Sequence, residues 1–204
     1  MDVPIDIPGL EQFIPILPFG AVVFVKGGVD PAKTFFAFHL VETANISGRS
    51  VNIITSRSRI EVEELLQEYF PAATDVNVID FLKEDLMETI PSGSLVVVDS
   101  FSFLLLENDI SYACAKIMDF KLASRMTSSL FVLVIDDGML DERTEAALMH
   151  YSDGLIKFMT VESSEGMKRF MRIPLWVDRT CFDDNIFYAF NDGRISLDLK
   201  YRVV

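Results

Sequence analysis

Short apolar runs recur along the first two thirds of the chain, and segments with helical spacing separate them. The five runs occupy residues 21–26, 50–55, 75–80, 94–100 and 129–137. All are far shorter than the roughly 20 residues of a membrane-spanning helix, and turn residues bound most of them, which favours buried strands. Five apolar strands alternating with helices predict an α/β fold in which a mainly parallel sheet is covered on both faces.

The segments between these runs carry helix signals. Residues 34–43, just after Pro31, present a broad apolar face at helical spacing, and a Pro suits the first turn of a helix. Ser58 and Glu61 have the spacing of a capping box, which predicts a helix that ends at Pro71. Two further helices are expected over residues 81–90 and 109–126.

The last quarter of the chain has a different texture. Residues 154–162, 168–177, 185–190 and 194–199 alternate polar with apolar side chains, and Asn-Asp-Gly at 191–193 is a hairpin signal. The sheet is therefore expected to finish with antiparallel strands. No linker separates this part from the rest, so residues 1–204 are predicted to form a single domain.

Composition excludes several classes of function. Half of the residues are apolar, which is typical of a globular chain, and the net charge is −13. Such a charge repels nucleic acids and anionic lipid, so neither is an expected partner. The acidic, Pro-containing N-terminus does not resemble a secretory signal, and two Cys with no metal-type spacing favour reduced thiols. These features together predict a cytoplasmic protein.

The loop after the first strand resembles a phosphate-binding loop. It reads Gly-Gly-Val-Asp-Pro-Ala-Lys-Thr, where Gly27, Lys33 and Thr34 fit the pattern of a Gly, four residues, a Gly, a Lys and a Ser or Thr. Ala32 replaces the second Gly. In such loops backbone N–H groups surround the phosphates, the Lys reaches the outer phosphates, and the hydroxyl holds magnesium. Gly27, Gly28, Lys33 and Thr34 are therefore the candidate nucleotide-binding residues.

Two residues of this loop disfavour phosphate binding. Pro31 lacks an N–H group, and Asp30 brings a negative charge near the expected anion. Together these changes are expected to weaken nucleotide binding by a factor of roughly 10² to 10⁴. The alternative is that the loop is a plain turn between a strand and a helix, with Lys33 in water.

Acidic residues end two of the predicted strands. Asp99 follows four apolar residues, and a carboxylate at that place orients magnesium in phosphate-loop proteins. Thr34 and Asp99 are thus the candidate magnesium ligands if a nucleotide binds, and Asp99 is the one catalytic candidate. Asp136 and Asp137 end another strand and could join Asp99 in an acidic metal site. We favour instead that they cap the following helix.

In this order the segments resemble the KaiC-like branch of the RecA-family ATPases. The resemblance runs from residue 18 to about residue 197, and the following segments carry it: PFGAVVFVKGG with Lys33 and Thr34, then VVVDSFSFLL, HYSDGLIKF and FNDGRISL. It implies a RecA-like core with a phosphate-loop fold, assembly into a ring or a dimer, and an ATP site at subunit interfaces.

The chain departs from the family where the family performs its chemistry. An acidic pair that supplies the catalytic base usually follows the second strand, but Ser56 and Arg57 stand there. The family also offers a Lys and an Arg to a neighbouring subunit near the C-terminal strands, where this chain has Leu175 and Val177. A shift of two residues in that alignment would bring in Arg179.

These departures predict a degenerate family member, a pseudo-ATPase that acts as a regulatory or interaction protein. We expect no resident cofactor, and we expect a protein partner or a homo-oligomer. The main alternative is a slow ATPase or an ATP-binding switch that uses Mg-ATP with Lys33, Thr34 and Asp99. A third hypothesis, a nucleic-acid-binding relative of recombinases, is disfavoured by the acidic balance of the chain.

Overall fold

The computed structural model describes residues 3–14, 16–80, 90–106, 108–164, 166–177 and 182–198. Nine strands form the main sheet, with these bounds: β3 (Val22–Gly27), β4 (Val51–Thr55), β5 (Val76–Asp80), β6 (Leu95–Asp99), β7 (Leu130–Asp136), β8 (Gly154–Ser163), β9 (Gly166–Leu175), β10 (Phe182–Asn191) and β11 (Arg194–Leu197). Their order across the sheet is β11-β10-β9-β8-β3-β7-β6-β4-β5. Two short strands, β1 (Val3–Pro4) and β2 (Ile16–Leu17), pair separately.

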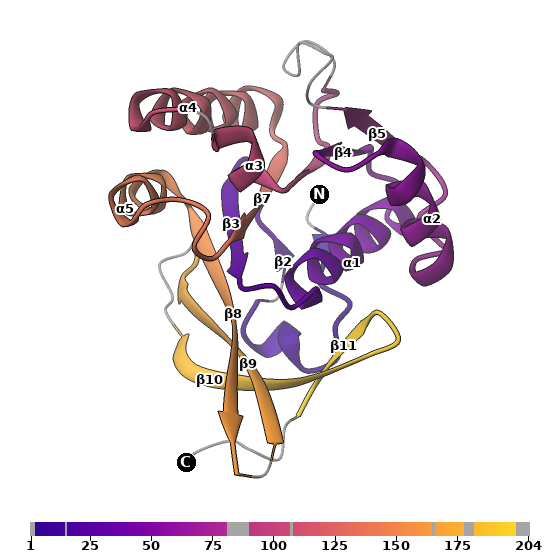
Figure 1. Ribbon diagram of the computed structural model, residues 1–204. Helices are drawn as coiled ribbons and strands as arrows, with labels where there is room; N and C mark the ends of the chain where they lie inside the picture. The colour runs from indigo at the N-terminus through magenta and orange to yellow at the C-terminus, as the bar shows by residue number, and fades with distance from the viewer. Residues whose placement is uncertain are drawn as a thin grey trace.

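The helices lie on both faces of this sheet (Figure 1). One face carries α1 (Ala32–Ile46) and α2 (Arg59–Tyr69), and the other carries α3 (Phe101–Leu105), α4 (Ile110–Thr127) and α5 (Glu142–Tyr151). A 3-10 turn, η1 (Leu10–Gln12), precedes β2. The predicted capping box is confirmed, since Ser58 precedes α2 and its hydroxyl accepts the N–H of Glu61 at 3.2 Å.

The five apolar runs all form parallel strands, as the sequence predicts. β3 pairs with β7, β7 with β6, β6 with β4, and β4 with β5. The C-terminal strands β9, β10 and β11 are antiparallel to their neighbours, which confirms the expected finish of the sheet. β8 differs, because it lies parallel to β3 and antiparallel to β9. The helix predicted over residues 81–90 falls almost wholly outside the described residues.

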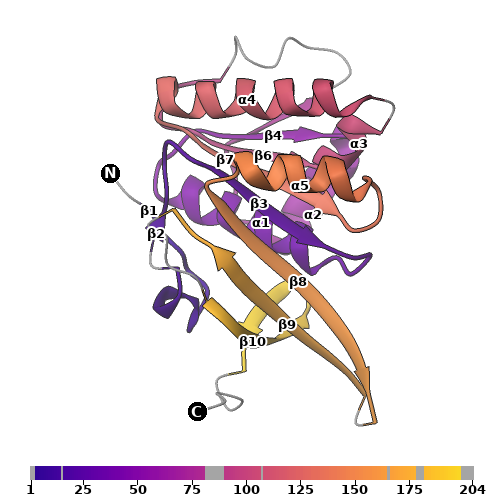
Figure 2. The ribbon, with the colours of Figure 1, turned by 90° about the vertical axis from the view of Figure 1, so that its left-hand side faces the viewer.

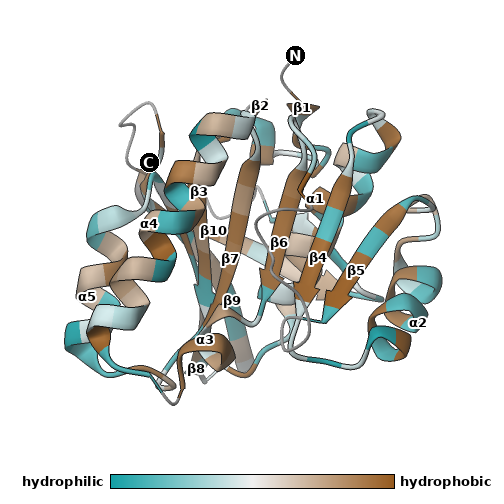
Figure 3. Ribbon diagram, turned by 90° about the horizontal axis from the view of Figure 1, so that it is seen from above, coloured by the Kyte–Doolittle hydropathy of each residue, from teal (hydrophilic) through white to brown (hydrophobic). Residues whose placement is uncertain are grey.

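Burial on both faces explains why the central parallel strands are mainly apolar. Val23 and Val25 face the core that contains α1 and α2, whereas Val22 and Phe24 face the core that contains α4 and α5. Figure 3 shows the result as hydrophobic colour along most of β3, β6 and β7, whereas β4 and β5 also carry hydrophilic bands. A sheet buried on both faces has no polar side, so its strands read as continuous apolar runs.

The parallel arrangement gathers four strand ends at one edge of the sheet. The register places Gly27 beside Asp136 and Thr55 beside Asp99. The β8–β9 hairpin extends beyond the body of the sheet at this end (Figure 2). In open α/β sheets ligands bind at the carboxyl ends of parallel strands, so this edge is where a site is expected.

Candidate functional site

The loop between β3 and α1 is shaped by its neighbours. A Cβ atom at Gly27 would lie 3.0 Å from the Cβ of Phe158 and 3.1 Å from its carbonyl oxygen, so β8 leaves no room for a side chain there. Pro31 is the N-cap of α1 and lies one residue before the first turn in which we expected it. Its carbonyl accepts the N–H of Phe35 at 3.0 Å, an ordinary helical bond.

Lys33 lies in the first turn of α1 and is only 4% exposed. Its Nζ donates to the carbonyl of Gly28 at 2.6 Å and lies 2.9 Å from Oδ1 of Asp136, at the end of β7. Lys33 is therefore not in water, which overturns that part of the alternative. A buried ammonium needs a partner of opposite charge, and Asp136 provides it.

Thr34 and Asp99 come together as the sequence predicts. The hydroxyl of Thr34 donates to Oδ1 of Asp99 at 3.3 Å, and Asp99 is 2% exposed. Oδ2 of Asp99 accepts no hydrogen bond, and its partner is the guanidinium of Arg57, whose Nε lies 3.5 Å away. Burial raises the pKa of Asp99 above its usual value; Arg57 opposes this rise and the nearby charge of Asp136 adds to it.

Arg57 occupies the position after β4 at which the sequence comparison with KaiC-like proteins led us to look for an acidic residue. Two further contacts position its side chain toward Asp99. Its backbone N–H donates to the hydroxyl of Thr55 at 3.0 Å, and its guanidinium also reaches Glu61 at 3.1 Å. The neighbouring Ser56 donates its backbone N–H to the carbonyl of Asp99 at 3.1 Å. A cation therefore faces the buried carboxylate from the end of β4.

Asp136 and Asp137 do not cap the following helix, which corrects our interpretation of the sequence. α5 begins six residues after Asp136, and its N-cap is Asp141. Asp136 instead accepts from the hydroxyl of Ser100 and faces Lys33, while Asp137 lies 3.1 Å from Lys26. Within the described ranges no group of three or more His, Cys, Asp or Glu side chains could hold a metal ion, so the acidic metal site gains no support.

Asp30 also differs from expectation, because its carboxylate is paired. One oxygen accepts the N–H of Ala32 at 2.9 Å, and the other lies 2.7 Å from Nε of Arg169 on β9. The hydrogen bond with Asp30 raises the pKa of the Arg169 guanidinium. The repulsion between Asp30 and a phosphate is therefore smaller than we expected from the sequence, since Arg169 compensates the charge.

A cavity of about 520 Å³ opens beside these groups. Its charged and polar lining includes Lys33, Thr34, Arg57, Asp99 and Asp136. Asp137 also lines the cavity and pairs with Lys26. Within the lining, Lys33 pairs with Asp136 and Arg57 with Asp99.

Leu175 is the last residue of β9, and Val177 is a half-exposed apolar residue two positions later. Arg179, the residue that a shifted alignment would bring in, lies outside the described residues.

The order of the strands, the helices on both faces and the loop after β3 define a RecA-type α/β fold with phosphate-loop topology. The structure is similar to that of a KaiC-like protein from the hyperthermophilic archaeon Pyrococcus horikoshii OT3, with a TM-score of 0.76 and 15% identity over 97% of this chain and 99% of that one. It is equally similar to the flagellar accessory protein FlaH from Methanocaldococcus jannaschii, with a TM-score of 0.76 and 12% identity over 97% of this chain and 98% of that one.

These likenesses establish the fold. The predicted KaiC-like, RecA-type architecture is confirmed over nearly the full length of the chain. No protein-family model and no curated protein matches the sequence. No helix in the described part of the chain is long and apolar enough to cross a bilayer.

Proposed function

We propose that this chain is a regulatory or interaction protein that has kept the KaiC-like scaffold and does not hydrolyse ATP efficiently. The observation that carries the proposal is the ion pair between Lys33 and Asp136, at 2.9 Å. The Lys of a phosphate loop acts by meeting the outer phosphates of the nucleotide. Here a carboxylate of the same chain faces that amine.

A second ion pair, between Arg57 and Asp99, supports the same conclusion at the candidate magnesium ligands. Magnesium in such a site is held by the hydroxyl after the Lys and by a strand-end carboxylate, here Thr34 and Asp99. Both residues are in place, but the guanidinium of Arg57 lies 3.5 Å from the second oxygen of Asp99. Arg57 also leaves no acid at the place of the catalytic base. Phosphoryl transfer depends on positioning and on charge neutralisation, so these changes disfavour it.

Calorimetric titration with Mg-ATP tests this function. We expect no micromolar binding to the unaltered protein. Asp136→Asn should raise the affinity by roughly 10-fold or more, because it frees Lys33 from a charge-assisted hydrogen bond. Asp119→Asn is the control, since Asp119 is an exposed carboxylate on α4 and does not line the cavity that contains Lys33. Micromolar binding of Mg-ATP by the unaltered protein would contradict the proposal.

The alternative function, a slow ATPase or an ATP-binding switch, is favoured by one observation. Thr34 and Asp99 retain their contact at 3.3 Å at the edge of a cavity of about 520 Å³. A slow ATPase requires phosphate release that disappears in Lys33→Ala, measured with a coupled phosphate assay. Equal background release by the protein and the variant excludes the ATPase, and the absence of micromolar binding in the titration with Mg-ATP excludes the switch.

A further inference from the structure

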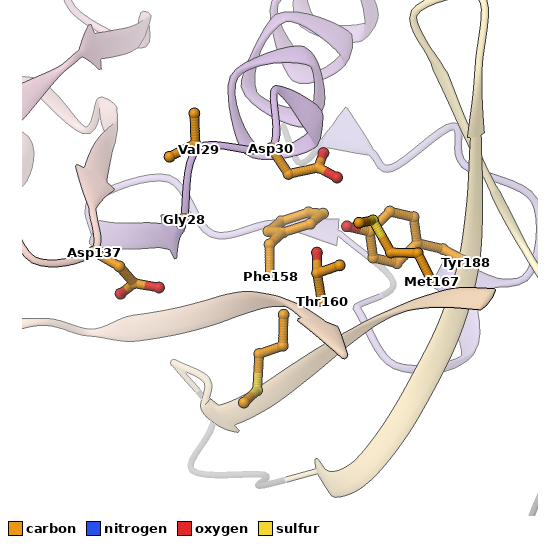
Figure 4. A pocket seen from close by; sticks show the side chains of 9 residues that line it. Gly28, Val29, Asp30, Asp137, Phe158, Thr160, Met167 and Tyr188 are labelled. Atoms are coloured by element: carbon orange, nitrogen blue, oxygen red, sulfur yellow. The ribbon is translucent and has the colours of Figure 1, made fainter. Parts of the chain in front are cut away.

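The C-terminal strands β8, β9 and β10 have an outer face that lies away from the phosphate loop. Figure 4 shows Phe158 and Thr160 on β8 and Tyr188 on β10 at a cavity of about 530 Å³ beside that loop. Side chains alternate along a strand, so Met159 and Phe187, which are neighbours of these residues in the sequence, belong to the opposite face. Figure 2 views the sheet from this outer side, and beyond α5 no described helix lies over the three strands.

An apolar row crosses the outer face from strand to strand. In the register of the sheet, Met159 lies beside Phe170, and Phe170 lies beside Phe187. The ring centres of the two Phe residues are 5.9 Å apart, and Met159 is 36% exposed. Met and aromatic side chains are enriched at protein interfaces, and an exposed apolar surface with a polar rim marks a contact site. The row therefore offers an apolar surface to a partner.

Two cations border this row on the side where β8 begins. Lys157 lies directly opposite Arg172 in the register of β8 and β9, and like charges in that position destabilise a sheet. Arg172 donates to the neutral amide oxygen of Asn185 at 2.7 Å, and its guanidinium lies 5.7 Å from the centre of the Phe170 ring. Within the described ranges, neither cation forms an ion pair with a carboxylate. An anion from outside the chain would relieve their repulsion.

The remaining charges of the outer face do not cancel these two. Lys168 lies opposite Val161, on the other side of the apolar row, and Asp198 lines one small hollow together with Lys168. Among the residues placed on this face, three cations thus meet one carboxylate, whereas the chain as a whole carries −13. The outer face is a basic and apolar surface on an acidic molecule, so an acidic partner is favoured over a basic one.

We propose that this outer face binds an acidic segment of a partner protein. A carboxylate of the segment lies between Lys157 and Arg172, and a large apolar side chain packs on Met159 and Phe187. Along β9 the step from Arg172 to Phe170 is two positions, and side chains on one face of an extended segment recur at the same interval. The acid and the apolar side chain of the segment are therefore two positions apart. This inference rests on the proposed function, since it names the class of partner that an interaction protein of this kind binds.

Three blocked peptides that differ only in charge test the proposal: Ser-Glu-Ser-Phe-Ser and its versions with Gln or Lys in place of Glu. They are titrated into protein carrying ¹³C-methyl-labelled Met, without nucleotide or magnesium. We expect the Glu peptide to shift the Met159 signal in a saturable way, and the Gln peptide to bind roughly 5-fold more weakly. The Met167 signal should stay unchanged, because Met167 lines the cavity on the opposite face (Figure 4). Equal binding of the three peptides, or no saturable shift of Met159, overturns the proposal.

Variants of the two cations locate the contact. Arg172→Gln and Lys157→Gln should each weaken binding of the Glu peptide by roughly 3-fold. Lys157→Glu places a carboxylate opposite Arg172, so it should abolish peptide binding while raising the urea midpoint of unfolding. Arg59→Gln, at an exposed position of α2 on the other face of the sheet, is the control and should leave the affinity unchanged. Unaltered affinity in both Arg172→Gln and Lys157→Gln, or equal weakening in Arg59→Gln, contradicts the site.

Two other occupants of the outer face are distinguished by the same Met159 signal. If a single-stranded oligonucleotide shifts it at a lower concentration than the Glu peptide does, the face binds nucleic acid and the proposal fails. If dilution of the protein alone shifts it, the face joins two copies of the chain and the proposal fails. If neither treatment shifts it, an acidic segment is supported as the occupant.

The peptide titration is independent of the proposed absence of ATP hydrolysis. None of the residues placed on the outer face lines the cavity that contains Lys33. Micromolar binding of Mg-ATP would contradict the proposed function whatever the peptides do. Failure of the peptides to bind leaves the titration with Mg-ATP unaffected, so the two failures can be told apart.

Discussion

At the scale of single residues, Asp99 is the side chain whose burial most clearly lowers the free energy of unfolding at neutral pH. It is 2% exposed, one of its oxygens accepts no hydrogen bond, and burial raises its pKa above the usual 3.8. A raised pKa in the folded state means that the folded protein binds the proton more tightly than the unfolded chain. The free energy of unfolding therefore falls as the pH rises from about 3.8 through the raised pKa.

Asp99→Asn tests this cost, because it keeps the shape and removes the charge. We expect the variant to be more stable than the unaltered protein at neutral pH, and the difference to shrink as the pH falls through the raised pKa toward 3.8. Urea denaturation at several pH values measures it. A variant that is less stable at neutral pH would show that the pairing with Arg57 outweighs burial.

The individual residues of the candidate site were predictable only in part. Lys33, Thr34 and Asp99 follow from spacing, because a loop pattern and a strand-end carboxylate can be read directly. The ion pairs of Lys33 with Asp136 and of Arg57 with Asp99 cannot be read in this way. They depend on which strands become neighbours and on where each strand ends, and the sequence states neither.

At the scale of elements, the pair of Asp30 and Arg169 joins the phosphate loop to β9 across 139 positions of sequence. Asp30→Ala should lower the free energy of unfolding by about 1–3 kcal/mol, because it also leaves the N–H of Ala32 without its acceptor. Arg169→Leu should cost less, since the Arg side chain is 32% exposed and solvent screens the pair.

A double-mutant cycle measured by urea denaturation isolates the link. Asp30→Ala and Arg169→Leu should be less costly together than the sum of their separate effects, by about 0.5–1.5 kcal/mol. Arg172→Leu is the matched control, because Arg172 lies on the same strand and contacts Asn185 instead. Coupling of Asp30 with Arg172 as strong as that with Arg169 would mean that β9 responds as a whole and that the ion pair is not the cause.

The elements themselves were largely predictable, and the misses have physical reasons. Long apolar runs and caps identify the five parallel strands and helices α1, α2 and α4. α3 has only five residues, too few to show a helical period. β8 is parallel to β3 because α5 returns the chain to the end of the sheet at which β3 begins. The alternation of polar and apolar residues within a strand carries no information about the direction of that strand.

At the scale of the whole molecule, topology and charge point to different kinds of ligand. The parallel strands bring Gly27, Asp99 and Asp136 to one edge, and open α/β sheets bind ligands at the carboxyl ends of their strands. The chain nevertheless carries 31 acidic and 18 basic residues. The candidate phosphate loop thus belongs to a strongly negative molecule, and this charge disfavours phosphate-rich ligands.

The excess of acidic residues yields a prediction about nucleic acids. We disfavoured the hypothesis that this chain is a nucleic-acid-binding relative of recombinases. Binding to DNA or RNA gains free energy when basic side chains displace counterions, so true binding strengthens steeply as salt falls. With a net charge of −13, we expect no change in the fluorescence anisotropy of labelled single-stranded or double-stranded oligonucleotides at low or at physiological salt. Binding whose affinity falls steeply as the salt concentration rises would reveal a basic surface strong enough to overcome the net charge. Such a result would support the nucleic-acid hypothesis.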